Sequence, residues 1–286
     1  MDATNDALLD WREGIPYLTG SFEESNSAVD QWLNALDQAL DGCFVGKAAM
    51  PGLSVLSTQD NDLATLISQH AHRCRSRLLS LAGGDAFSGL PADIVILHFR
   101  EMSEYYRYIE AFFPEGEFGG SAGIQIRSGY PHIAVWGEAY QGVGVIAHEM
   151  LHLAVMHREL PIWIDEGLAQ MFEVDMGSGS TLTFEQQEIQ ACREFWLSND
   201  IQLLWQGEGF QGLEDVQKYS YMMAEMLMRN LAERYGKRSF FKRNRETAFV
   251  RFISTAHYED SGDEAANKEL GVSLSEIAAQ FIGPPR

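Results

Sequence analysis

The amino-acid sequence predicts an α+β fold in which strands and helices are mixed at first and helices alone follow. Short apolar runs typical of strands lie before residue 140, whereas the later segments repeat their apolar residues at helical spacing. Composition supports a folded protein, since 45% of the 286 residues are hydrophobic. A chain of this length can therefore bury a sizeable core in one large domain or two moderate ones.

Composition also excludes several classes of partner. The 41 acidic and 21 basic residues give a net charge of −20, which repels phosphate backbones, so we expect no nucleic-acid partner. No apolar run reaches the ~18 residues of a membrane span, and the acidic N-terminus lacks a signal-peptide pattern. We therefore expect a soluble, cytoplasmic protein with no membrane partner. Three widely separated cysteines predict neither a disulfide framework nor a cysteine zinc site.

The first half of the chain contains the predicted strands. The run ADIVILHF is continuously apolar, as in a buried strand, and Gly-Gly or proline ends each neighbouring helix. The predicted elements, in order, are a helix over 24–41, a strand over 53–58, a helix over 60–84, a strand over 92–99, a helix over 100–116 and two short strands within 119–137.

The second half is predicted to be helical, with a Gly/Ser linker at 176–181. The predicted helices cover about 140–157, 164–175, 183–198, 214–235, 239–255 and 273–281. This pattern divides the chain into an N-terminal helical segment (1–50), an α+β subdomain (51–175) and a helical C-terminal subdomain (176–286).

The segment VIAHEMLHLAV places His148, Glu149 and His152 in an otherwise apolar helix. Buried ionisable groups cost free energy unless something satisfies them. Residues four apart lie one turn apart on one helix face, so two imidazoles can bind one metal ion there. Glu149 projects ~100° further round the helix, where a carboxylate can reach a water molecule. This is the HExxH pattern of two zinc ligands and a general base.

A third ligand is available further along the chain. Glu166 follows His152 after thirteen intervening residues, enough for one helix to end, the chain to turn at Pro161 and a second helix to return. Asp165 is the alternative ligand beside it. His157 lies well round the helix from both histidines and is a weaker candidate.

Together, the motifs HEMLH and WIDEGLAQ resemble those of gluzincin metallopeptidases, the peptidase MA-like group. The likeness covers about residues 90 to 240 and includes the GGSAG segment before two short strands. It implies a zincin-like mixed sheet with an active-site helix. It also implies Zn²⁺ held by His148, His152 and Glu166, with Glu166 favoured over Asp165.

The segment YSYMMAEMLMRNLAERYG resembles a later part of that family, in which a tyrosine precedes a helix ending in Tyr-Gly. Alignment back from RYG implies that Tyr221 is the donor to the developing oxyanion, with Tyr219 as the alternative. Trp163 is expected in the core, and His70 and His72 are expected at the surface.

We therefore expect a zinc metallopeptidase that hydrolyses peptide bonds in a peptide or protein substrate through water activated by Glu149. The short strands within 119–137 are expected to pair with an extended substrate. Two alternatives stay open: a non-proteolytic zinc-binding scaffold, and a metal-free helical interaction protein with a chance motif. The sequence does not define the oligomeric state, the substrate, or whether cleavage is internal or terminal.

Overall fold

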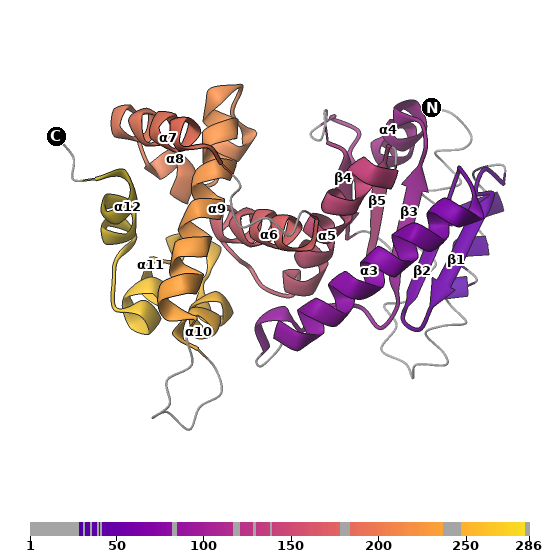
Figure 1. Ribbon diagram of the computed structural model, residues 1–286, viewed down its shortest axis with the longest axis horizontal. Coiled ribbons are helices and arrows are strands. Elements are labelled where there is room, and N and C mark those ends of the chain that lie inside the picture. The colour runs from indigo at the N-terminus through magenta and orange to yellow at the C-terminus, as the bar shows by residue number, and fades with distance from the viewer. Residues whose placement is uncertain are drawn as a thin grey trace. The chain divides into compact units, whose positions relative to one another are not determined.

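The computed structural model of the protein is mixed α+β, with a five-stranded mixed sheet and mostly helical content elsewhere. Its described residues form two compact units, the first within Met1–Arg77 and Leu90–Leu153 and the second within Leu78–Gly89 and Ala154–Arg286. Figure 1 labels the elements. The described residues are 29–30, 32–34, 36–38, 40, 42–81, 85–116, 121–127, 130–137, 139–177, 184–236 and 247–283.

The first unit is built on the sheet. Its parallel centre consists of β2, β3 and β5, flanked by antiparallel β1 and β4. The sheet order is β1 (Gly46–Met50), β2 (Leu53–Ser57), β3 (Ile94–Phe99), β5 (His132–Trp136) and β4 (Gly123–Ile126). Every residue of β3 is buried, which explains its continuous apolar run.

Strand β1 lies in a segment for which the sequence predicted no strand. Its run GKAAM has little apolar alternation, and pairing with β2 makes it a strand, with Gly46 opposite Ser57 and Met50 opposite Leu53. Gly46 also lies against the backbone, since an added Cβ would be 2.0 Å from the carbonyl oxygen of Asp60. Antiparallel pairing with the next strand, across a two-residue turn, therefore produced the element that periodicity did not.

Three helices accompany the sheet: α3 (Asn61–Leu81), α4 (Met102–Glu110) and α5 (Ala139–Val155). The described residues of the predicted 24–41 helix are helical between Val29 and Gln38. Trp32 from that helix is 2% exposed and packs in one aromatic core with Phe99 and Tyr108. The elements predicted from apolar spacing in this half are thus present.

Buried histidines in this unit are satisfied by hydrogen bonds. The expectation of a surface position for His70 was wrong: it is 2% exposed, and its Nε2 lies 3.3 Å from the Sγ of Cys74 one turn later. His72 is half-buried. The fully buried His132 is held between the Tyr108 hydroxyl at Nε2 and a backbone carbonyl at Nδ1. An imidazole can therefore be buried in the core, on a helix or on a strand, when neighbouring groups form hydrogen bonds with its ring nitrogens.

The second unit is helical. Its single turns of 3₁₀ or π-helix are η1 (Asp85–Phe87), η2 (Glu208–Gln211), η3 (Tyr258–Asp260) and η4 (Ala266–Leu270). Its helices are α6 (Ile162–Gly177), α7 (Gln186–Ser198), α8 (Gln202–Trp205), α9 (Asp215–Tyr235), α10 (Ala248–Thr255), α11 (Asp263–Ala265) and α12 (Leu274–Ile282). Within the described ranges, no helix is long and apolar enough to cross a membrane.

Trp163 of α6 belongs to the core, as the sequence predicted. It is fully buried between the rings of Trp205 and Phe252, with centroids 5.0 and 6.3 Å away. Its indole Nε1–H donates to the carbonyl oxygen of Ser261 at 2.9 Å. This packing fixes the first turn of α6, three residues before Glu166.

Candidate metal centre

The helix α5 buries most of the segment that carries the HExxH motif. Apolar residues around the motif, namely Ile146, Ala147, Met150, Leu151, Leu153 and Ala154, are at most 2% exposed. Within this apolar setting His148 and His152 are half-buried, and Glu149 is 7% exposed. The polar trio is therefore in the low-dielectric environment where ionisable groups require partners.

The two motif histidines lie next to each other, with ring centroids 4.8 Å apart and planes inclined by 72°. Glu166 joins them: one ligand atom from each of the three residues lies within 4.8 Å of the other two. All three side chains are half-buried. Among the described residues this is the one group of three or more His, Cys, Asp or Glu residues close enough to hold a metal ion.

The residues present fit a zinc ion in donor type. Two imidazoles and one carboxylate are a known catalytic ligand set, and ligand distances of ~2.1 Å place tetrahedral donors about 3.4 Å apart. The ligand atoms of the three side chains lie within 4.8 Å of one another, a range that includes this spacing.

Glu166 occupies the second turn of α6. This helix begins directly after Pro161, whose carbonyl oxygen accepts the backbone N–H groups of Ile164 and Asp165. Proline suits the start of a helix because its φ is already helical and its missing N–H would be unpaired there. Asp165, the alternative ligand, is half-buried and does not belong to the group of three.

The weaker candidate His157 lies outside the group. Its Nε2 is 3.3 Å from the Oγ of Ser88. Within the described part of the chain, it does not add a fourth donor to the three.

Glu149 lies close enough to α4 for its charge to act on Tyr105. Burial raises the pKa of that phenol, and the negative charge of Glu149 raises it further. The Tyr105 hydroxyl lies 2.8 Å from the Oγ of Ser121. The sequence gave no signal for this neighbourhood, because these residues come from separate segments of the chain.

The two tyrosines at the start of α9 have different surroundings. The ring of Tyr219 packs on Phe195 of α7 at 5.0 Å. Tyr221 lies ~200° further round the helix and meets Phe210 edge-on at 5.1 Å. Tyr221 shares a face with Ala224, one of the residues of α9 that touch α6 at Gly167. Only Tyr221 of this pair is therefore on the α6 side of α9.

An ion-pair cluster joins α6 to α9. Arg229 donates from Nε to the fully buried Glu225 at 2.8 Å, from Nη1 to Asp175 at 3.1 Å, and from Nη2 to the carbonyl oxygen of Met171 at 3.2 Å. Sequence reasoning missed this cluster. The signal was present, because Glu225 and Arg229 lie four apart in a methionine-rich apolar helix, as the motif histidines do in α5.

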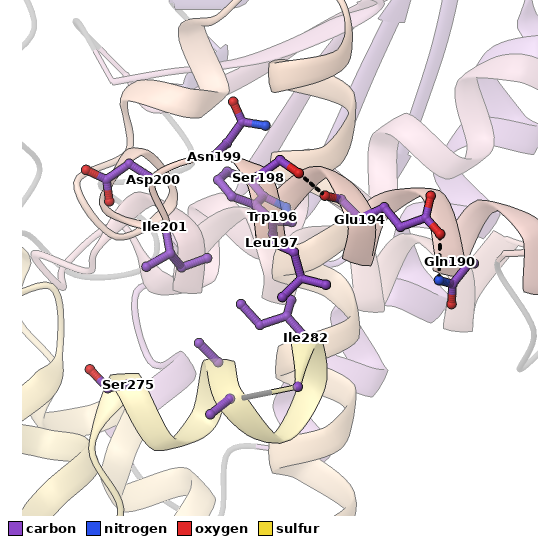
Figure 2. Close-up of a pocket in the computed structure, with 13 residues that line it drawn as sticks. Gln190, Glu194, Trp196, Leu197, Ser198, Asn199, Asp200, Ile201, Ser275 and Ile282 are labelled. Atoms are coloured by element: carbon purple, nitrogen blue, oxygen red, sulfur yellow. Dashed lines mark hydrogen bonds between the residues drawn. The ribbon is translucent and has the colours of Figure 1, made fainter. Parts of the chain in front are cut away.

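A separate cavity of about 700 Å³ lies between α7, the turn that follows it and α12 (Figure 2). Its wall carries two carboxylates, Glu194 and Asp200, beside apolar residues such as Leu197 and Ile282. Glu194 accepts a hydrogen bond from Gln190 at 2.8 Å. None of its lining residues belongs to the predicted site.

Comparison with protein-family models gives no match to this chain, and comparison with curated proteins gives none either.

Proposed function

We propose that the protein is a zinc-dependent metallopeptidase of gluzincin type, with a zincin-like arrangement of its sheet and motif helix. One observation carries the proposal: His148, His152 and Glu166 bring two imidazoles and a carboxylate within 4.8 Å of one another. The buried Glu149 adjoins them in the sequence. A chance HExxH motif would not be expected to acquire a third donor from another helix.

His148, His152 and Glu166 would hold the ion. When bound, Zn²⁺ supplies Lewis acidity, which makes a carbonyl carbon more electrophilic and a water molecule more acidic. Glu149 accepts the proton from the attacking water on a carboxylate oxygen. It then delivers that proton to the nitrogen of the leaving amine. Glu149 is buried and follows His148 directly on α5, so its carboxylate is held close to the proposed metal ligands.

Tyr221 is the proposed donor to the oxyanion that forms as water attacks the carbonyl. By helical spacing Tyr221 lies on the same face of α9 as Ala224, which contacts α6, the helix that carries Glu166. A phenol donates one strong hydrogen bond to such a charge. Tyr219 is less suitable, because its ring packs against α7.

An extended substrate would pair with β4. This strand ends the sheet order and is paired with β5, whereas β5 already has β3 and β4 as neighbours. Among the described residues, β4 therefore has a neighbouring strand on one side only, unlike β5. Backbone hydrogen bonds at an edge strand bind peptides with little dependence on sequence.

Elemental analysis and a base-removing variant test the proposal. The purified chain should contain about one zinc per molecule, and His148→Ala should lose the metal. Glu149→Gln should keep zinc yet stop the cleavage of internally quenched peptides. Glu159→Gln, at an exposed position after the motif helix, serves as the matched control and should cleave like the parent.

The outcomes separate the alternatives. Zinc without any peptide cleavage by the parent chain would favour the non-proteolytic zinc-binding scaffold. Absence of bound zinc after incubation with the ion would favour a metal-free interaction protein. Equal turnover by the parent and Glu149→Gln would remove Glu149 as the base.

A further inference from the structure

Two hydroxyl groups pair beside the motif helix. The side chain of Tyr105 is fully buried, and its hydroxyl lies 2.8 Å from the Oγ of Ser121, a half-buried residue two positions before β4. In the described part of the chain, neither hydroxyl has a second hydrogen-bond partner. The two hydroxyl groups carry one proton each, and the hydrogen bond between them uses one of these protons. The other proton remains available for donation to a ligand.

The direction of this hydrogen bond follows from burial. If Ser121 donated to Tyr105, the phenolic proton would be left unpaired in the core, at a cost of ~1–3 kcal/mol. Burial raises the pKa of the Tyr105 phenol, so the proton stays on its oxygen. Tyr105 therefore donates to Ser121, and the hydroxyl proton of Ser121 points away from Tyr105 towards the more accessible side.

The backbone that carries Ser121 is fixed by further hydrogen bonds. Its carbonyl oxygen accepts from the Tyr106 hydroxyl at 3.2 Å and from the indole Nε1–H of Trp136 at 3.0 Å. The next carbonyl, of Ala122, accepts from the backbone N–H of Trp136 at 3.0 Å. Ala122 is itself exposed, so this anchored turn borders solvent. A donor held so firmly loses little entropy when it binds a ligand.

The turn adjoins the helix that carries Glu149. A Cβ added to Gly123 would lie 2.3 Å from Cγ1 of Val145, so β4 begins in direct contact with α5. Val145 precedes Glu149 by one helical turn. The charge of Glu149 also acts on the phenol of Tyr105. Ser121 therefore precedes a strand that contacts the motif helix, and it is bonded to a phenol on which the charge of the proposed general base acts.

We infer that Ser121 binds the substrate, donating its hydroxyl proton to a backbone carbonyl of a peptide extended along β4, and that Tyr105 is the residue that positions it. This inference rests on the proposed peptidase function. Any peptide offers such a carbonyl, so the contact selects extended main chain rather than a particular side chain. The hydroxyl complements the backbone groups of β4 at the end where that strand contacts α5.

The test uses the fastest-cleaved peptide from an internally quenched library, identified with the zinc-loaded parent chain. Its affinity is then measured by fluorescence anisotropy in the Glu149→Gln background, where no hydrolysis interferes. Ser121→Ala should weaken binding about tenfold, since one hydrogen bond is lost. Tyr105→Phe should weaken it less, and adding Tyr105→Phe to Ser121→Ala should cost nothing more.

Tyr108→Phe is the matched control. Tyr108 is another buried phenol of α4, but its hydroxyl binds His132 at 2.7 Å. This variant should lose stability and still bind the peptide like the parent background. A general weakening of α4 would instead affect peptide binding in the Tyr105 and Tyr108 variants alike.

Three results would overturn the inference. If Ser121→Ala binds the peptide as tightly as the parent background, the donor assignment fails while the peptidase proposal stands. If losses from Ser121→Ala and Tyr105→Phe add, Tyr105 does not act through Ser121. If the zinc-loaded parent cleaves no peptide, the proposed function fails and the substrate contact fails with it.

Discussion

A Cβ atom added to Gly167 would lie 2.7 Å from the carbonyl oxygen of Ala224. The helices α6 and α9 thus approach each other through backbone atoms at this point, and Met228 closes the same contact with its Cγ at 2.7 Å. The glycine permits this contact between two helices, one of which carries Glu166 and the other Tyr221.

Gly167→Ala should destabilise the protein by about 1–3 kcal/mol, because the new methyl group meets backbone that cannot move aside. Helix propensity alone predicts the opposite, a gain of about 1 kcal/mol. Urea unfolding of the parent and the variant shows whether the substitution lowers or raises the free energy of unfolding. A more stable variant would show that the two helices can separate without loss.

Arg229→Met should destabilise the protein by about 3–5 kcal/mol, because it leaves the buried carboxylate of Glu225 without its cation. Adding Glu225→Met should recover much of that loss. Asp175→Asn, which alters the exposed partner of Arg229, should cost less than about 1 kcal/mol. Urea unfolding of the parent, Arg229→Met, Glu225→Met and the double variant forms the cycle, and strictly additive losses for Arg229 and Glu225 would contradict the coupling.

Tyr221→Phe should lower kcat by about 10²-fold with little change in KM, because the donor acts on charge that develops only in the transition state. Zinc content should stay at the parent level. Tyr219→Phe, whose ring packs on α7, is the control and should retain the parent kcat. If Tyr219→Phe lowered kcat more than Tyr221→Phe, the donor would be Tyr219.

His132 should make the protein less stable as pH falls below 6.5. Burial lowers the pKa of this imidazole from 6.5 to about 4, so the folded protein holds it neutral between Tyr108 and the Tyr130 carbonyl. As the pH falls, the imidazole takes up a proton in the unfolded chain at a higher pH than in the folded protein. The stabilisation is therefore complete above pH 6.5 and is lost towards pH 4, by about 3 kcal/mol in total.

Unfolding free energies measured from pH 7 to pH 4 test this dependence. His132→Gln should show a shallower slope than the parent over that window, although it is less stable at pH 7. Parallel curves for the parent and His132→Gln would show that the buried imidazole is not responsible.

Local patterns predicted much of the secondary structure. The motif helix, expected over 140–157, is α5 (Ala139–Val155), because its apolar residues cover nearly the whole helix. Helix α6 begins two residues earlier than expected, at Ile162, since Pro161 already has a helical φ. The expected linker at 176–181 lies largely outside the described residues, as does the start of the expected 239–255 helix.

Other features could not be read from short stretches of sequence. The four-residue helix α8 is too short to show a period, and β1 exists through its pairing with β2. The bond between Tyr105 and Ser121 joins positions sixteen residues apart. Such contacts depend on which elements the fold brings together, which a local period does not encode.

By itself the sequence determined the chemistry that is available, because spacing along one helix places His148, Glu149 and His152 on neighbouring turns whatever surrounds them. The tertiary structure decided which acidic side chain joins the two histidines, and it is Glu166 rather than its neighbour Asp165. It also decided what Gly167, Arg229 and Ser121 contact. The physical reason is that helical spacing is fixed by local geometry, whereas the packing of one helix on another depends on side chains distant in the chain.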